Sequence, residues 1–234
     1  MVMSIVETHE LTKVYGQGET AVTALDGVNL HVEPGEFVAV MGPSGCGKST
    51  LLHLIGGLDR PTSGQVILDG RKLAQLNDDA LTELRRRKVG FVFQFYNLIP
   101  VLTAVENAAL PLILDGVSSG EARARATQWL ERIGMQDRLT HRPDALSGGQ
   151  QQRVAIARAL ATEPALILAD EPTGNLDSHA GDDIARLLRQ ISDEWGRTIL
   201  MVTHDPRISA YANRIVLLKD GMVVDDTHIS GAPQ

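Results

Sequence analysis

The sequence predicts an α/β fold, in which helices flank a mostly parallel sheet, with an antiparallel β lobe at the N-terminus and an inserted helical subdomain. Three observations predict this arrangement. Short apolar runs alternate with helical segments in the first and last thirds of the chain, a pattern typical of parallel sheets. The first two extended segments are joined by a short glycine-containing turn. Helix-start signals punctuate residues 95–160.

The first third of the chain predicts the N-terminal lobe and the beginning of the main sheet. Gly16-Gln17-Gly18 separates two extended stretches, and Pro34-Gly35 precedes a short apolar run that suits a buried strand. A glycine-rich loop follows that run and leads into a helix, and a later helix ends on the basic run Arg85–Lys88. The predicted elements are strands Ser4–Tyr15, Thr20–Val32, Phe37–Met41, Val66–Leu68 and Val89–Phe93, with a helix at Lys48–Gly56.

The remaining elements follow from capping and periodicity. Thr103-x-x-Glu106 and Ser118-x-x-Glu121 both match a capping box, and Gly134 fits a helix stop. Strand and helix then alternate, with one amphipathic helix among the later segments. These segments are strands Ala165–Ala169, Thr198–Val202, Ile215–Leu218 and Met222–Val224, a helix at Ser178–Trp195 and a short helix after Pro206. We expect a single domain over residues 1–234, with a core at about 1–94 and 161–234 and a helical subdomain at about 95–160.

Composition limits the classes of partner. The formal net charge of −7 argues against a nucleic-acid-binding surface over the whole domain, and we expect no nucleic-acid partner. Cys46 is the one cysteine, which excludes an intramolecular disulfide and a cysteine-built metal site. The segment Met1–Leu11 carries Glu7 and Glu10 and lacks the features of a secretory signal. Because the apolar runs are too short to cross a bilayer, we expect a cytoplasmic chain that reaches a membrane through a partner, without inserting directly.

A glycine-rich motif predicts a phosphate site. Its G-x-x-x-x-G-K-[ST] pattern lies after a buried strand and at the start of a helix, which disfavours a chance match in a glycine-rich turn. Backbone N–H groups and the helix N-terminus would face phosphate, Lys48 would reach the β- and γ-phosphates, and Ser49 would bind Mg²⁺. The side chain of Cys46 has no evident chemistry in this loop. The residues expected to bind nucleotide here are Gly42, Pro43, Ser44, Gly45, Cys46, Gly47, Lys48, Ser49 and Thr50.

A second motif is the acidic end of the apolar strand Ala165–Ala169. Taken alone, Asp170 and Glu171 would more often be a solvated strand end. Next to a phosphate loop, Asp170 suits coordination of Mg²⁺, and Glu171 suits the general base that polarises an attacking water. General-base catalysis is typically worth about 10²–10⁴ in rate.

A third motif, Leu146-Ser147-Gly148-Gly149-Gln150, precedes the helical stretch Gln151–Leu160. A serine with two glycines ahead of a helix is a second anion-binding element, far from the first in sequence. With these motifs the chain resembles the ATP-binding cassette (ABC) ATPase family over nearly its whole length. The resemblance implies a P-loop NTPase (RecA-like) core, with ATP and Mg²⁺ as cofactors. It also implies a head-to-tail homodimer with ATP, in which Ser147 and Gly149 of one chain cap the γ-phosphate held by the other. Gln150 is a further nucleotide-binding residue of the same motif.

The resemblance assigns further residues. Tyr15 matches the aromatic residue that stacks on adenine, and Gln94 the glutamine that senses Mg²⁺ and the attacking water. His204 matches the histidine that contacts the γ-phosphate, and Asp177 the aspartate that communicates across the dimer interface. In isolation Tyr15 would more often be a strand aromatic and His204 a capping or surface residue; their order along the chain makes the set specific. The implied catalytic residues are Lys48, Gln94, Glu171 and His204, and the implied metal-binding residues are Ser49, Gln94 and Asp170.

Within the family, Phe93–Pro100, Leu110–Leu112 and Pro172–Asp177 resemble the exporter branch, which includes lipoprotein-releasing, macrolide-export and antimicrobial-peptide-export ATPases. The resemblance implies integral-membrane permease partners and a place on the inner face of the cell membrane. One alternative is the related cell-division ATPase, which signals across the membrane without moving a solute. Another is a soluble member acting in DNA repair or translation. The sequence disfavours a soluble member of this kind. The stretch between Ser49 and Ser147 is too short for the long coiled-coil insertion of DNA-repair relatives, and the sequence has one cassette where translation relatives have two.

Overall fold

Two sheets form the frame of the computed structural model, which describes residues 4–229. The start of the N-terminal segment considered above therefore lies outside the described residues. A four-stranded antiparallel sheet has the order β2-β1-β4-β5, and a six-stranded sheet has the order β10-β9-β3-β8-β7-β6. In the larger sheet every neighbouring pair is parallel except β10–β9. The strands are β1 Val6–Tyr15, β2 Val22–Val32, β3 Phe37–Met41, β4 Ser63–Leu68, β5 Arg71–Lys72, β6 Val89–Phe93, β7 Leu166–Asp170, β8 Thr198–Thr203, β9 Arg214–Lys219 and β10 Met222–His228.

Helix starts follow the capping residues in the sequence. Thr103 forms the predicted capping box at α3, but at α4 the Ser118 hydroxyl accepts from the Glu121 N–H without the reciprocal bond. Gly134, with φ of 75°, follows the end of α4 as predicted. The helices are α1 Lys48–Ile55, α2 Asp78–Lys88, α3 Ala104–Leu114, α4 Ser119–Arg132, α5 Gly148–Leu160, α6 Ser178–Asp193 and α7 Pro206–Ser209, with short 3₁₀ turns at Gly18–Thr20, Leu73–Gln75, Gln136–Arg138 and Pro143–Ala145.

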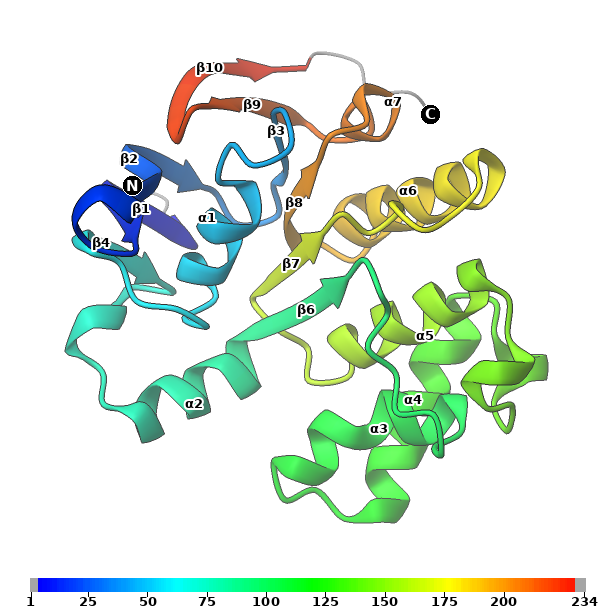
Figure 1. Ribbon diagram of the computed structural model, residues 1–234. Coiled ribbons are helices and arrows are strands. Elements are labelled where there is room, and N and C mark those ends of the chain that lie inside the picture. The colour runs from blue at the N-terminus through cyan, green and yellow to red at the C-terminus, as the bar shows by residue number, and fades with distance from the viewer. Residues whose placement is uncertain (1–3, 230–234) are drawn as a thin grey trace.

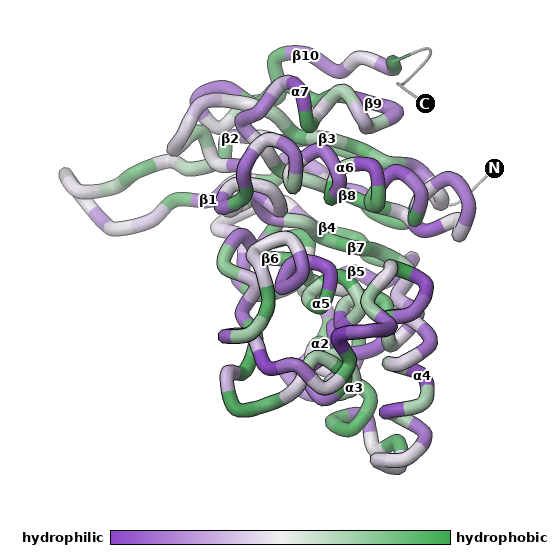
Figure 2. Tube along the Cα trace, turned by 90° about the vertical axis from the view of Figure 1, so that its right-hand side faces the viewer, coloured by the Kyte–Doolittle hydropathy of each residue, from purple (hydrophilic) through white to green (hydrophobic). Residues whose placement is uncertain are grey.

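The apolar strands of the larger sheet separate two hydrophobic cores, because successive side chains point to opposite faces. Phe37 and Ala39 of β3 pack into the core shared with α3, α4, α5 and α6. Val38 and Val40 pack into the core shared with α1, α2 and the four-stranded sheet. Figure 1 shows the same layers, with the green helices α3–α5 grouped beyond β6 and the cyan α1 between the two sheets. Figure 2 shows the apolar strands running through the middle of the molecule and the β1–β2 turn projecting from it.

Some predicted boundaries were wrong because ladder hydrogen bonds do not depend on side-chain hydropathy. β4 begins at Ser63 instead of Val66, since Ser63 pairs with Thr12 of β1. β10 continues through polar residues to His228, which pairs with Arg214. β7 includes Asp170, and α6 ends at Asp193, before Trp195. Among residues 4–229, no helix is both long enough and apolar enough to span a membrane.

Candidate functional site

A hollow of about 720 Å³ lies at the carboxyl ends of the parallel strands, where ligands bind in open α/β sheets. Every residue that lines it except Ala24 belongs to the set predicted from the sequence. Ala24 lies on β2, whose backbone passes so close to the phosphate loop that a Cβ on Gly47 would lie 2.2 Å from the Ala24 oxygen. No local pattern in the sequence predicts this contact. The lining residues are Ala24, Pro43, Ser44, Gly45, Gly47, Lys48, Ser49, Thr50, Gln94, Glu171 and His204.

The phosphate loop spans the interval between β3 and α1. Gly47 has φ of 104°, a left-handed conformation that favours glycine. The buried Lys48 donates from Nζ to the carbonyl oxygens of Gly42 at 2.8 Å and Pro43 at 3.0 Å. The Cys46 thiol points into the hydrophobic core, and the Cys46 N–H donates to Pro43. Lys48 is thus held at the loop, whereas the side chain of Cys46 is turned away from the hollow.

Ser49 and Asp170 meet although they are far apart in sequence. The Ser49 hydroxyl donates to Oδ1 of Asp170 at 2.9 Å, and Nε2 of His53 lies 3.9 Å from Oδ2. Hydroxyl and carboxylate oxygens are the donors that Mg²⁺ prefers, so these two side chains fit that ion. Within the described residues no group of three or more His, Cys, Asp or Glu side chains could hold a metal by itself. Any Mg²⁺ bound here would take further oxygen ligands from Gln94, which lines the same hollow, from nucleotide or from water.

Glu171 and His204 form a polar pair at the mouth of the hollow. Oε1 of Glu171 lies 3.0 Å from Nδ1 of His204, and Oε2 accepts from the His204 backbone N–H at 3.4 Å. Glu171 has φ of 46°, a left-handed conformation that costs about 1 kcal/mol for a residue with a Cβ. Its backbone N–H donates to Val202 at 3.0 Å, so β8 holds this turn in place. The Glu171 carboxylate is mostly covered, whereas His204 is exposed.

Gln94 is held against the loop that follows Glu171. Its side-chain amide donates to Oδ1 of Asn175 at 3.2 Å, and the Asn175 amide donates back to the Gln94 carbonyl at 3.0 Å. A Cβ on Gly174 would lie 2.8 Å from Nε2 of Gln94, so the loop approaches closely because residue 174 is glycine. Sequence reasoning did not single out Asn175, although it lies next to predicted residues in Gly174-Asn175-Leu176-Asp177.

Tyr15 lies at the end of β1 and does not line the hollow. Its ring is partly exposed, and its hydroxyl donates to Oδ2 of Asp59 at 2.9 Å. Nζ of Lys13 lies 4.8 Å from the ring centroid and donates to Oδ1 of Asp59 at 2.8 Å. Burial acts to raise the pKa of Asp59, but hydrogen bonds from Lys13, the Arg60 backbone and Tyr15 outweigh it and lower the pKa. The exposed ring is thus held by an ionised carboxylate, which no pattern in the sequence indicated.

Ser147, Gly149, Gln150 and Asp177 are not brought to the first hollow. They line a separate hollow of about 200 Å³ between the N-termini of α5 and α6. Ser147 and Gln150 form a reciprocal capping box at α5, and Asp177 accepts from the Ala180 N–H to cap α6. Within one chain, these predicted residues therefore lie outside the site that contains Lys48.

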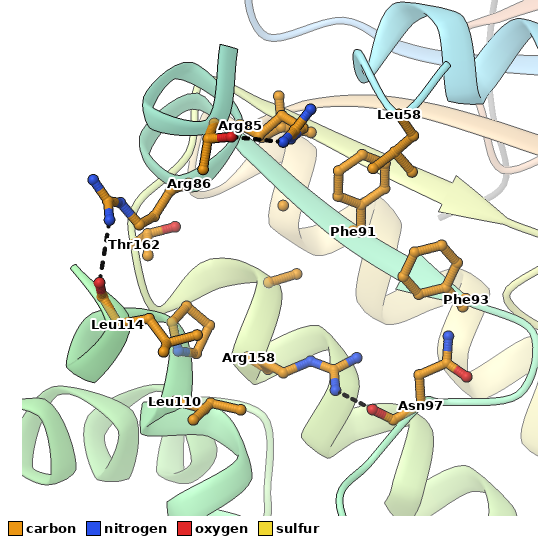
Figure 3. Close-up of a pocket in the computed structure, with 15 residues that line it drawn as sticks. Leu58, Arg85, Arg86, Phe91, Phe93, Asn97, Leu110, Leu114, Arg158 and Thr162 are labelled. Carbon is orange, nitrogen blue, oxygen red and sulfur yellow. Dashed lines mark hydrogen bonds between the residues drawn. The ribbon is translucent and has the colours of Figure 1, made fainter. Parts of the chain in front are cut away.

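A third hollow, of about 590 Å³, lies between β6, α2 and the helices α3 and α5 (Figure 3). Phe91, Phe93, Leu58, Leu110 and Leu114 supply an apolar surface, as the close-up shows. Three guanidinium groups border it: Arg85 donates to Gly57, Arg86 to Leu114, and Arg158 to Tyr96 and Asn97. Burial lowers the pKa of Arg158 from its usual value. The hollow is thus an apolar groove with a cationic border.

Comparison with known proteins places these features in a family. Residues 25–174 match the family described as ABC transporter. The chain is 51 % identical to an uncharacterized ABC transporter ATP-binding protein, MJ0796 of Methanocaldococcus jannaschii, over 97 % of this chain and 98 % of that protein. It is 50 % identical to the lipoprotein-releasing system ATP-binding protein LolD of Geobacter metallireducens, over 95 % of this chain and 99 % of that protein.

Two further matches are a longer protein that includes a permease part in its name and a solved structure. The chain is 51 % identical over 96 % of its length to the macrolide export ATP-binding/permease protein MacB of Mannheimia succiniciproducens, but spans only 35 % of that protein. A dimeric structure of MJ0796 in a post-hydrolysis state, bound to ADP and Pi, matches with a TM-score of 0.88 and 50 % identity, covering 97 % of this chain and 99 % of that one. The chain belongs to the ABC transporter family and has the fold of its ATP-hydrolysing cassette.

Proposed function

We propose that the chain binds MgATP in the hollow at the ends of β3, β7 and β8 and hydrolyses it there to drive a membrane permease. The observation that supports this most is the convergence of four separate segments on one hollow. The phosphate loop, Gln94, Glu171 and His204 all line it, and Asp170 is hydrogen-bonded to its edge through Ser49. The post-hydrolysis structure of the relative MJ0796 supports the same chemistry.

Each residue has a role that its position allows. Lys48 and the N-terminus of α1 bind the phosphates. Ser49, Gln94 and Asp170 would hold Mg²⁺. The ion, when bound, neutralises charge that develops on the phosphates. Glu171 accepts a proton from the attacking water, and His204 holds the carboxylate in place and contacts the γ-phosphate. Tyr15 stacks on the adenine ring.

The complete site takes residues from two copies of the chain. Ser147, Gly149 and Gln150 present a helix N-terminus that is remote from Lys48 within one chain. In a head-to-tail homodimer they cap the γ-phosphate bound by the partner, and Asp177 lies where it can report across the interface. The dimeric structures of MJ0796 support this arrangement.

The permease docks in the apolar groove of Figure 3, at the junction of a catalytic core (about 1–94 and 161–234) and a helical subdomain (about 95–160). The groove is lined by Phe93, directly before Gln94, so a partner seated there contacts the segment that leads into the ATP site. Such docking places the chain on the cytoplasmic face of the cell membrane. We infer extrusion of a lipoprotein, lipid, peptide or macrolide in preference to cell-division signalling without transport. The names of LolD and MacB, which specify lipoprotein release and macrolide export, support transport.

Phosphate release by the purified chain with MgATP tests the proposal. Lys48→Ala should abolish hydrolysis and weaken ATP binding, because the phosphates lose their main fixed cation. Lys72→Ala, on the exposed strand β5, is the matched control and should behave as the unmodified chain. If Lys48→Ala kept both its affinity by calorimetry and its turnover, the assignment of the phosphate loop would be wrong.

A further inference from the structure

The side chain of Gln152 lies between the two loops that carry Gln94 and Glu171. Gln152 belongs to α5 and is fully buried, at 0 % exposure. Its Nε2 donates to the carbonyl oxygen of Phe93 at 3.3 Å and to that of Pro172 at 2.6 Å. Phe93 directly precedes Gln94, and Pro172 directly follows Glu171. One amide nitrogen is therefore bonded to both loops.

The two partners of Gln152 fix the orientation of its side-chain amide. Because both partners are carbonyl oxygens, the amide must present its NH₂ group to them. The other end, Oε1, is buried without a hydrogen-bond partner among the described residues. An apolar side chain of the same length would remove this unpaired acceptor, but it would also leave the carbonyl oxygens of Phe93 and Pro172 without the donor that joins them. The donor end of Gln152 is thus the part of the side chain that joins the two loops.

The two loops that Gln152 contacts are also bonded directly to each other. Phe93 and Asp170 are partners in the parallel ladder of β6 and β7, and Asn175 is hydrogen-bonded to Gln94 in both directions. At its other end, α5 begins at the capping box of Ser147. A shift of α5 would therefore be transmitted by one buried side chain to both loops together.

We propose that Gln152 is a positioning residue that couples the N-terminus of α5 to the Gln94 and Glu171 loops of its own chain. This inference rests on the proposed function, in which Ser147 contacts the nucleotide of the partner while Gln94 and Glu171 act on the nucleotide of their own chain. Gln152 is then the link by which the two composite sites of a dimer sense one another.

The test is Gln152→Met, which keeps the length of the side chain and removes its donor. Turnover per bound nucleotide should fall roughly tenfold, since the two hydrogen bonds that Nε2 donates to the loops are lost. The dissociation constant for MgATP should stay within about twofold, because no group that contacts nucleotide is changed. Counting turnover per bound nucleotide removes any unfolded fraction from the result. The matched control is Gln151→Met: Gln151 donates to Leu146 at 3.1 Å and to neither loop, so its turnover should be near normal.

A double-mutant cycle separates positioning from general damage. In a Glu171→Gln background, Gln152→Met should slow single-turnover hydrolysis by less than about threefold, because alignment of the general base no longer contributes there and only the effect on the Gln94 loop remains. The proposed coupling would be overturned if Gln152→Met slowed hydrolysis in the Glu171→Gln background as much as it does alone. It would also be overturned if Gln152→Met alone left turnover unchanged. If the unmodified chain failed to hydrolyse ATP, the proposed function itself would be at fault; if only Gln152→Met were without effect, that function would stand.

Discussion

The Nδ1 atom of His204 lies 3.0 Å from Oε1 of Glu171, which joins the ends of β8 and β7 across the mouth of the hollow. Glu171, directly after β7, has a left-handed conformation, and the backbone N–H of His204 donates to the second carboxylate oxygen at 3.4 Å. Both carboxylate oxygens are thus held by His204, which orients a group suited to act as a general base.

Glu171→Gln should keep ATP binding and slow turnover by about 10²-fold or more, because an amide cannot accept a proton from water. Binding should then outlast hydrolysis and trap a dimer, visible by gel filtration or light scattering with MgATP. Glu131→Gln, on the exposed side of α4, is the control. A Glu171→Gln chain that stays monomeric at micromolar concentration with nucleotide bound would count against ATP-driven closure.

Selectivity for the base should be loose. The Tyr15 hydroxyl is occupied by Asp59, so the ring offers stacking, which any purine accepts. We expect measurable hydrolysis of GTP, though less than of ATP, and we expect Tyr15→Ala to weaken the binding of both by roughly tenfold. Tyr15→Phe, which keeps the ring, should lose much less. An ATP preference of several orders of magnitude would reveal a hydrogen-bonding reader of the adenine edge.

The pair of Arg214 and Asp226 should make stability depend on pH. Hydrogen bonding from the buried Arg214 lowers the pKa of Asp226 from its usual 3.8, against the opposing effect of burial. A carboxylate with a lowered pKa stabilises the folded state above its unfolded pKa, and this stability is lost as pH falls through the folded value. Asp226→Asn should therefore reduce the free energy of unfolding at neutral pH by about 1 kcal/mol and flatten its decline below about pH 4.

Thermal unfolding between pH 3 and pH 7 measures this effect. Asp225→Asn is the matched control, because Asp225 is exposed on the same strand and its carboxylate accepts a hydrogen bond from the nearby Thr227. If the stability of the Asp226→Asn and unmodified chains fell equally as the pH was lowered, other carboxylates would be responsible for the pH dependence.

Mixed dimers test whether each active site is shared. Lys48→Ala and Ser147→Arg should each be inactive alone, but in their mixed dimer one site holds both lesions and the other holds none. Random mixing makes about half of the dimers mixed, so about a quarter of the normal ATPase activity should return if the sites act independently. Activity is measured across mixing ratios, with mixed dimers verified by cross-linking.

Zero activity at every ratio would leave either strictly coupled sites or a wrong interface. Addition of unmodified chains separates the two, because strict coupling predicts that either variant poisons them. Recovery in the mixture combined with no recovery in Lys48→Ala alone would exclude a site built within a single chain.

Much of the fold was predictable because its signals are local. Phe37–Met41 and Val89–Phe93 were confirmed as strands, since short apolar runs bounded by turns identify buried strands. The capping box at Thr103 was confirmed because its partners lie one helical turn apart. The strand ends at Ser63 and His228 were not predicted, because they are set by hydrogen-bonded pairing with another strand and not by hydropathy.

The sequence by itself determined the phosphate loop, the acidic strand end, the second glycine-containing helix start and the family, because each motif is a contiguous run whose spacing carries its chemistry. Only the tertiary structure decided that Ala24 lies against Gly47, that Asp59 holds the Tyr15 hydroxyl, and that Gln152 bridges two loops. These contacts join segments far apart in the chain. The strand order of the two sheets brings them together, and no local pattern of residue types encodes that order.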